Sequence, residues 1–395
     1  EGCTAQVGWI GARKVIFPGL PRGTRGELAT VKASSATANE GLVVPKLLVA
    51  LYVLEKMIVL ASPSSNLDYL RDASNGIEMR HDAGEVYHVE DDANHLIQRA
   101  VKISPQQSTL FRDLDLDAAT PSHNGTGGVY FIPNSAHENV AVFKPSDEEN
   151  PSAAGEGFIH EYAAYLLDNG MAGVPETALG CVSLEEGKLQ RGSLQAYVQN
   201  SEDAEDFGPG VFPTEDIHRI GVLDVRLLNC DRHSGNLMRN KATGKLTPID
   251  HGAAFPSAYE GKLADVSFEW LQYPQARKPF SPKLLREIEA LDPHKDVETL
   301  RDAGVAPGGQ LSTWMSTTLL QMAAKKGFTL YDIGMMMQRQ GDRSKPSTLE
   351  KMFHTIVQTK VNRDDLPDFE SFFTSLAEVY LVDMAKSRGT APSDE

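Results

Sequence analysis

A short polar string, CDRHSGN at residues 230–236, limits the architectures open to this chain more than any other part of its sequence. It is followed by Ile249-Asp250-His251-Gly252, so Asp231, Asn236 and Asp250 together offer two carboxylates and one amide. Phosphoryl transfer needs a carboxylate near the attacking hydroxyl and oxygen ligands for Mg²⁺, in the order of a catalytic loop and then a metal loop. The alternative is that these residues only cap and turn their loops.

A lysine upstream of this string extends the same interpretation. Lys144 follows the β-prone run 140–143, and strand alternation places it on the face of Val142. An ammonium beside an apolar side chain suits a nucleotide, with Val142 against the base and Lys144 on the α- or β-phosphate. Glu161, 17 residues downstream in a predicted helix, is placed to hold this ammonium. The alternative is a solvated lysine and a surface glutamate.

A glycine-rich string precedes the first β-prone run, residues 129–132. Gly125, Gly127 and Gly128 would let backbone N–H groups approach phosphate oxygens without a Cβ in the way. A plain hairpin turn explains the same string. The runs 129–132 and 140–143, separated by a polar turn, predict a β-hairpin.

The remaining pattern predicts a small mixed lobe before a larger helical one. A helix is expected at 158–169, with Phe158, Tyr162, Tyr165 and Leu166 on one face and Gly170 as its stop. A strand-like run, 192–199, leads into an acidic linker at 201–213. Helices are then expected at 214–230 with Thr214 as N-cap, and at 282–290, 311–326, 330–339, 348–359 and 368–387.

Charge and composition exclude some classes of protein. The 395 residues leave room for two or three domains at about 150 residues each. The net charge of −16 opposes binding to nucleic acid. The three cysteines are too few and too scattered for a disulfide framework, which favours a reducing, intracellular compartment. No secretory signal is evident, and the apolar run 47–54 is flanked by charges, so we expect a buried helix there and no transmembrane segment.

The ordered motifs resemble those of the phosphatidylinositol 3- and 4-kinase superfamily, in which the catalytic string reads Asp-Arg-His with an Asn soon after. The chain is most similar to the type II phosphatidylinositol 4-kinases, in particular the plant-type gamma group. The resemblance covers about residues 125 to 340 and rests on eight runs: GTGGVYF, VAVFKPSDEE, EYAAYLLD, GSLQAYV, DRHSGN, PIDHGAAFP, FEWLQYPQARKPFS and KKGFTLYDIGMMM.

The resemblance implies roles for individual residues. The three glycines would cover the ATP phosphates, Lys144 would contact them, and Glu161 would pair with Lys144. The strand containing Gln195, Tyr197 and Val198 would be the hinge between the lobes that reads adenine. Asp231 would act at the substrate hydroxyl, with His233 sharing that role, and Asn236 and Asp250 would hold Mg²⁺. The metal loop reads Asp-His-Gly in place of Asp-Phe-Gly, and no cysteine cluster for acylation is present.

The charges in the segment after Asp250 indicate which phosphate acceptors are favoured. Between residues 251 and 276 the only Lys or Arg is Lys262, set among acids, which favours phosphatidylinositol over a lipid with several phosphates. The alternative is an acidic loop on an acidic protein. Phe268, Trp270, Leu271 and Tyr273, next to Arg277 and Lys278, suit either contact with an anionic membrane or core packing.

We therefore expect an α+β, two-lobed, protein-kinase-like fold that uses ATP and Mg²⁺. The predicted domains are an N-terminal region of unknown fold at 1–100, a kinase N-lobe at 101–200 and a C-lobe at 201–390. The expected reaction is transfer of the ATP γ-phosphate to the inositol 4-hydroxyl, and the 4-position follows from the resemblance alone. The alternatives are a Ser/Thr protein kinase and a non-catalytic nucleotide-binding scaffold. The expected location is the cytoplasm, free or peripheral at a membrane.

Overall fold

The computed structural model describes residues 6–10, 13–17, 72–73, 76–80, 86–88, 114–122, 128–148, 156–185, 188–362 and 368–389. Internal contacts divide the chain into two units, residues 1–44 and 45–395. The first unit contains the antiparallel pair β1 (Gln6–Ile10) and β2 (Arg13–Phe17). The second begins with a small antiparallel sheet of β3 (Asp72–Ala73), β4 (Gly76–Arg80) and β5 (Val86–His88). The apolar run 47–54 and the domain limits predicted at residues 100 and 390 lie outside the described residues.

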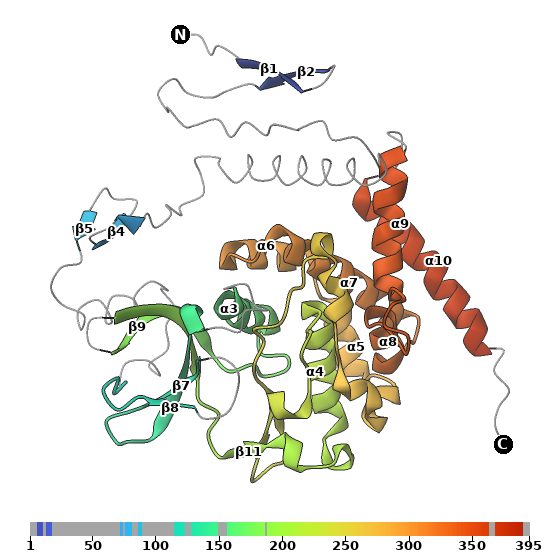
Figure 1. Cartoon of the computed structure of the whole chain (residues 1–395). Helices are drawn as coiled ribbons and strands as arrows, with labels where there is room; N and C mark the ends of the chain where they lie inside the picture. Colours follow the sequence, from blue (N-terminus) through green and yellow to red (C-terminus); the bar gives the residue numbers. More distant parts are fainter. Residues whose placement is uncertain are drawn as a thin grey trace. The chain divides into compact units, whose positions relative to one another are not determined.

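A five-stranded antiparallel sheet forms the smaller lobe, in the order β6, β7, β8, β10, β9 (Figure 1). Its strands are β6 (Thr120–Pro121), β7 (Tyr130–Pro133), β8 (Asn139–Pro145), β9 (Thr177–Glu185) and β10 (Lys188–Ala196). The predicted hairpin is confirmed, because β7 pairs with β8. The side chain of Asn134 closes its turn by accepting hydrogen bonds at 3.0 Å from the backbone N–H groups of Ala136 and Glu138. The strand expected at 192–199 begins earlier and ends at Ala196.

The helix of this lobe, α3 (Gly157–Asp168), lies between the sheet and the helices of the second lobe (Figure 1). It ends at Asn169, whose φ of 44° makes it a left-handed C-cap, one residue before the predicted stop. The predicted apolar face is only partly right. Phe158 is buried, but Tyr162 is half-buried, and the fully buried positions include the polar residues His160 and Glu161. The helix packs on two sides, so its inner surface extends beyond one apolar stripe.

The larger lobe is helical, as predicted, and carries one small sheet. Its helices are α4 (Thr214–Leu227), α5 (Pro282–Glu289), α6 (Pro293–Ala303), α7 (Pro307–Lys325), α8 (Leu330–Met337), α9 (Thr348–Asn362) and α10 (Phe369–Gly389). The sheet consists of β11 (Ser201–Asp203), β12 (Leu237–Asn240) and β13 (Leu246–Pro248). The two-lobed α+β architecture is thereby confirmed. Within the described part of the chain, no helix combines the length and the apolar content needed to cross a bilayer.

Short 3₁₀ turns connect these elements. They are η2 (Ser146–Glu148), η4 (Ala204–Asp206), η5 (Pro209–Val211), η6 (Ser234–Asn236), η7 (Ala258–Glu260), η8 (Lys262–Asp265), η9 (Glu269–Gln272) and η10 (Pro274–Arg277). Two of them, together with β11, occupy the stretch 201–213. The prediction of a plain linker there was wrong, because β11 pairs with β12 and orders the segment.

The helices differ from the sequence-based predictions at two further points. The sequence analysis did not predict α6, although Asp292 caps it by accepting from the N–H groups of His294 and Lys295, and Pro293 begins it. Thr214 is the first residue of α4 and not its N-cap; Pro213 takes that place without a side-chain cap bond. The Thr214 hydroxyl instead accepts a hydrogen bond from Lys278 Nζ at 3.1 Å.

One buried ion pair joins three helices around the core of the larger lobe. Arg226 on α4 contacts Asp296 on α6 at 2.8 Å, and both side chains are under a tenth exposed. Arg226 also donates to the carbonyl oxygen of Leu167 at the end of α3, at 2.9 Å. The guanidinium therefore links α4, α6 and α3, and its charge depends on Asp296 for compensation.

We predict that Asp296→Ala lowers the free energy of unfolding by about 3–5 kcal/mol, because it leaves the buried guanidinium of Arg226 without a counter-charge. The matched control is Asp383→Ala, which removes an exposed partner of Lys386 at 3.6 Å and should cost at most about 1 kcal/mol. Urea unfolding followed by tryptophan fluorescence measures both. Equal midpoints for the two variants would contradict the prediction.

Candidate active site

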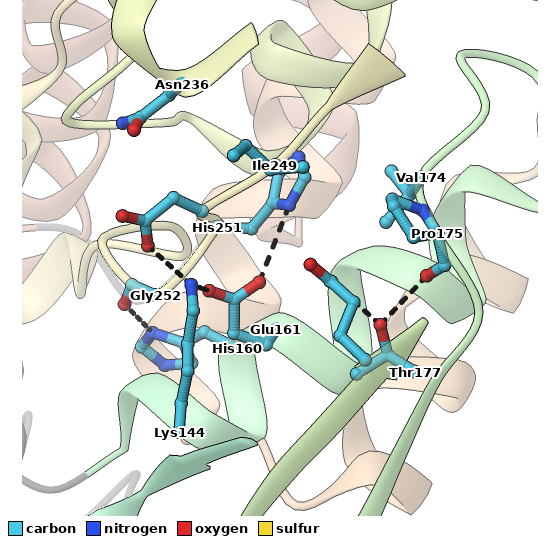
Figure 2. Close-up of polar contacts among 12 residues, drawn as sticks. Lys144, His160, Glu161, Val174, Pro175, Thr177, Asn236, Ile249, His251 and Gly252 are labelled. Carbon is cyan, nitrogen blue, oxygen red and sulfur yellow. Dashed lines mark hydrogen bonds and ion pairs between the residues drawn. The ribbon is translucent and has the colours of Figure 1, made fainter. Parts of the chain in front are cut away.

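A lysine between two carboxylates lies where the two lobes meet (Figure 2). Lys144 Nζ on β8 forms an ion pair with Glu161 on α3, and a second with Asp250 Oδ1 at 2.9 Å. Glu161 is buried, whereas the Asp250 side chain is about half exposed. The predicted pairing of Lys144 with Glu161 is therefore present, and Asp250 joins it from the larger lobe.

Nearby opposite charges keep both Lys144 and Glu161 charged. Burial opposes the charged form of Lys144, but Asp250 and Glu161 outweigh it and raise the lysine pKa above its usual value. Burial alone would also raise the pKa of Glu161. Lys144 and His251 outweigh that effect and hold the carboxyl pKa well below its usual range. The pair is thus ionised at neutral pH.

The loop that carries Asp250 has an unusual backbone. Asp250 adopts a φ of +56°, a left-handed conformation that costs energy for a residue other than glycine and occurs often at functional sites. The next residue, His251, is fully buried, with its Nδ1 3.7 Å from Glu161 Oε2. That distance suits an ion pair when the ring is protonated and is too long for a hydrogen bond. The strained backbone turns the Asp250 carboxylate toward Lys144.

Residues 230–236 form a loop that is fixed by hydrogen bonds from the side chain of Arg232. This buried guanidinium donates to Asp224 at 3.0 Å and to the carbonyl oxygens of Asn236 and Ile249 at 2.6 and 3.0 Å. The backbone N–H of Ile249 also donates to the carbonyl of Asn236 at 3.0 Å. The string at 230–236 and the metal loop are therefore neighbours, as their order in the sequence suggested.

Within this loop Asp231 and His233 are exposed, while Asn236 is buried. Asn236 donates through Nδ2 to the Asp231 carbonyl at 2.9 Å, which leaves its side-chain oxygen for another partner. His233 Nδ1 accepts from the Gly235 N–H at 3.1 Å. Although Asp231 is exposed as a residue, partial desolvation of its carboxyl raises its pKa; His233 opposes this shift and nearby Asp250 adds to it.

The predicted nucleotide-covering residues are only partly described. Gly125 and Gly127 lie outside the described residues. Gly128 donates through its N–H to the Glu148 carbonyl at 2.9 Å, and a Cβ at this position would lie 2.1 Å from Glu148 Oε2. A close approach of Glu148 thus gives Gly128 a structural reason to be glycine, besides any contact with phosphate.

The predicted hinge residues adjoin β8. Gln195 pairs with Val142 across the sheet, but its buried side chain donates to Thr177 Oγ1 on β9 at 2.9 Å. The Tyr197 N–H donates to the Val140 carbonyl at 2.9 Å. The Val198 carbonyl accepts from the Ser201 hydroxyl at 2.7 Å. The Gln195 side chain and these two backbone groups therefore serve the fold, and Val142 shares the face of Lys144.

The aromatic residues after the metal loop are in the core. Phe268, Trp270, Leu271 and Tyr273 are each at most 7% exposed, so the membrane-contact alternative is wrong for them and core packing is confirmed. Trp270 Nε1 donates to Asp224 at 3.0 Å, which ties this segment to α4. The neighbouring cations are engaged as well, since Arg277 stacks 3.5 Å above the Tyr331 ring centroid.

Three residues that shape the site were not among the predicted site residues. Asp224 is fully buried and accepts from Asn229, Arg232 and Trp270. Glu269 accepts from the Ser234 N–H at 2.7 Å and holds the string at 230–236. His160 contacts the Gly252 carbonyl. A charge inside the apolar run at 222–225 was the available signal for Asp224; Glu269 and His160 had none.

Known proteins resemble this chain over the region that contains the site. Residues 142–333 match the family model for phosphatidylinositol 3- and 4-kinase. This part of the chain is therefore similar to a phosphatidylinositol 3- and 4-kinase domain. Phosphatidylinositol 4-kinase gamma 4 of Oryza sativa subsp. japonica is 41% identical over 257 residues, 55% of this chain and 45% of that protein. Phosphatidylinositol 4-kinase gamma 3 of Arabidopsis thaliana is 38% identical over 298 residues, 62% of this chain and 51% of that protein.

The chain spans about half the length of the curated relatives it matches. Among solved structures, a proinflammatory kinase of Helicobacter pylori aligns over 56% of this chain and 94% of its own, with 13% identity and a TM-score of 0.34. That similarity is too low to support an inference.

The loops that carry Asn236 and Asp250 offer oxygen donors that fit Mg²⁺. Asp250 presents a half-exposed carboxylate and Asn236 an amide oxygen, both hard ligands. Among the described residues, no group of three or more His, Cys, Asp or Glu side chains forms a closed metal site. Mg²⁺ keeps several waters and needs one or two protein ligands besides the phosphates, so this donor set suffices.

We predict that the stabilisation supplied by Glu161 depends on pH in a defined direction. Because the folded-state pKa of Glu161 lies below 4.5, the stability it contributes is complete above about pH 4.5 and declines as the pH falls below that value. Glu161→Gln should lower the free energy of unfolding by about 1.5–3 kcal/mol at pH 7. Urea unfolding at pH 7 and pH 4 should show a smaller difference from the unaltered chain at pH 4.

The control for this measurement is Glu378→Gln, which removes an exposed partner of Lys326 at 2.6 Å. It should change the unfolding free energy by less than about 1 kcal/mol at both pH values. A Glu161→Gln effect that grows on acidification would contradict the assignment of a charged, buried glutamate.

Proposed function

We propose that the chain is an ATP-dependent phosphatidylinositol 4-kinase that transfers the γ-phosphate to the inositol 4-hydroxyl. The observation that carries this is the position of Lys144, held by Glu161 in the smaller lobe and 2.9 Å from Asp250 in the larger one. This arrangement brings a phosphate-binding cation and a metal-binding carboxylate together between the lobes. The names of the similar curated proteins support the lipid substrate.

In this proposal the nucleotide lies along β8. Val142 packs against the base, and the segment Gln195–Val198 faces adenine through backbone groups other than the Tyr197 N–H and the Val198 carbonyl. Lys144 contacts the α- or β-phosphate. The glycines at 125, 127 and 128 cover the phosphates. Since the Gln195 side chain is buried against Thr177, its contribution is limited to the backbone and to the shape of the hinge.

The larger lobe provides the groups that act on the transferred phosphate. Asn236 and Asp250 hold Mg²⁺, which when bound neutralises the charge on the phosphate oxygens. The acceptor hydroxyl attacks the γ-phosphorus and gives its proton to Asp231, with His233 sharing that role, while ADP leaves with its terminal charge matched by Lys144. Burial raises the pKa of Asp231, which makes it a better proton acceptor. Most of the rate enhancement then comes from positioning and fixed charges.

The charges near the metal loop favour an acceptor with a single phosphodiester. Lys262 is the only Lys or Arg between residues 251 and 276, and it is paired with Glu260 at 3.0 Å. Arg277 is stacked on Tyr331, and Lys278 donates to Thr214. A head group with several phosphates would need more cations than these. The proposed location is peripheral at a cytoplasmic membrane surface.

One observation favours a second candidate, a Ser/Thr protein kinase. The aromatic side chains at 268–273 are buried and give this segment no apolar surface for a bilayer. A protein hydroxyl could be presented to the same Asp231 without contact with lipid. The chemistry at the phosphate is the same in both cases, and the acceptor distinguishes them.

We predict that the full chain transfers labelled phosphate from MgATP to phosphatidylinositol in mixed micelles, and that Asp250→Ala abolishes this transfer. A generic Ser/Thr protein acceptor is offered in parallel, and Asp383→Ala, an exposed carboxylate on α10, serves as the matched control. Label in protein alone would replace the lipid by the protein acceptor. Label in neither, with ATP still bound, would favour a nucleotide-binding scaffold.

We also predict that Lys144→Met weakens ATP binding and lowers kcat by at least about tenfold, since it removes the cation that contacts the phosphates. Lys326→Met is the control, because Lys326 also pairs with a glutamate at 2.6 Å but lies outside the site. Isothermal calorimetry and the transfer assay measure the two effects. Unchanged affinity and turnover in Lys144→Met would remove the lysine from the proposed mechanism.

A further inference from the structure

Two consecutive residues of α3 contact consecutive residues of the metal loop (Figure 2). His160 Nδ1 lies 2.9 Å from the carbonyl oxygen of Gly252, and Glu161 Oε2 lies 3.7 Å from Nδ1 of His251. Lys144 adds a third link, to Asp250. Helix α3 and the loop that carries Asp250 are thus connected by polar contacts at two consecutive positions of each.

The contact of His160 has a defined chemistry. A carbonyl oxygen only accepts, so Nδ1 must carry the proton and donate it to Gly252. Burial lowers the pKa of His160, and the ring is therefore neutral near pH 7 and donates through one nitrogen. The other nitrogen, Nε2, lies 3.8 Å from Glu156. The ring is 8% exposed and packs edge-on against Phe255 at 5.4 Å, so it has little freedom to turn away.

The hydrogen bond from His160 matters because Gly252 lies inside the metal loop, residues 250–255. The metal loop has left-handed residues at both ends, Asp250 and Phe255, each with a φ of +56°. The larger lobe holds the later part of the loop, since the Phe255 N–H donates to Leu227 at 2.8 Å and the Ala253 carbonyl accepts from Cys230 at 3.1 Å. The bond from His160 holds the earlier part, two residues after Asp250.

We propose that His160 is a positioning residue for the metal loop. By fixing the Gly252 carbonyl to α3, it sets the direction of the Asp250 carboxylate and couples that direction to the Lys144–Glu161 pair. The nucleotide phosphates and the metal then meet groups whose positions are set together. This inference rests on the proposed function, because it concerns the residues assigned there to ATP and Mg²⁺.

The test compares two variants of His160 with a matched histidine elsewhere. His160→Phe keeps a ring but removes the donor, whereas His160→Asn places an amide N–H near the position of Nδ1. The control is His218→Phe. His218 is also buried, donates to a backbone carbonyl, that of Gln275, at 2.8 Å, and packs edge-on against Phe280 at 5.2 Å. It matches His160 in being buried, in bonding to a backbone carbonyl and in its edge-on ring contact, although it uses Nε2 in place of Nδ1 and contacts no residue of the metal loop through that bond.

The measurement is the affinity of the full chain for a non-hydrolysable ATP analogue, by calorimetry, with Mg²⁺ and with EDTA. The dissociation constant in EDTA divided by that with Mg²⁺ reports how well the metal is held, independently of turnover. We expect His160→Phe to reduce this ratio by about tenfold or more, as loss of a group that orients a metal ligand does. His160→Asn should restore most of it, and His218→Phe should lower the Tm to a similar extent with the ratio unchanged.

The inference is overturned if His160→Phe leaves the ratio unchanged, if His218→Phe reduces it equally, or if His160→Asn shows no recovery. Failure of the proposed function has a different signature. A chain that shows the expected ratios but transfers no phosphate to lipid or protein retains the role of His160 and loses the proposed activity. A chain that binds no nucleotide under either condition loses both.

Discussion

The sharing of one ammonium between two carboxylates organises the region where the lobes meet. Lys144 is largely buried, so its charge must be compensated there, and Glu161 and Asp250 compensate it from α3 and from the metal loop. A strand, a helix and a loop far apart in the sequence are thus brought to one point. Because Lys144 and Glu161 depend on their neighbours for their charged states, this interaction favours the observed contact between the small lobe and the metal loop.

A second buried charge organises the loop at 230–236. Asp224 on α4 receives hydrogen bonds from Asn229, Arg232 and the indole of Trp270. Arg232 also donates to the carbonyl oxygens of Asn236 and Ile249, and Ile249 directly precedes the metal loop. The same carboxylate therefore supports the loop bearing Asp231 and draws the following aromatic segment into the core. This explains why the aromatic residues at 268–273 are unavailable to a bilayer.

The junction between α3 and the metal loop is polar where an Asp-Phe-Gly loop would place an apolar ring. His251 is buried beside Glu161, and His160 on the facing helix donates to the next residue of the loop. Hydrogen bonds are directional, and a polar contact buried in this way is costly to break. Such a junction favours one relative position of α3 and the loop, and a site that depends on positioning benefits from this.

Much of the site followed from local chemistry. Strand alternation predicted that Lys144 shares the face of Val142, and the order of Asp231, Asn236 and Asp250 predicted a catalytic loop followed by a metal loop. The structure brings these two loops together through the contact between Asn236 and Ile249. The hairpin at 130–145 and most helices were also predictable, although the Asp292-Pro293 signal for α6 was overlooked. The roles of these residues in catalysis remain predictions, as do the domain limits.

By itself the sequence determined which side chains have the chemistry suited to phosphate and metal and where most strands and helices form, because these depend on side-chain chemistry and on periodicity over a few residues. Only the tertiary structure decided which polar groups are buried against which partners. His160 and Gly252 are 92 residues apart, Gln195 turns toward Thr177, and Trp270 toward Asp224. Such choices depend on how distant elements pack, since a buried polar group must find a partner wherever the fold supplies one.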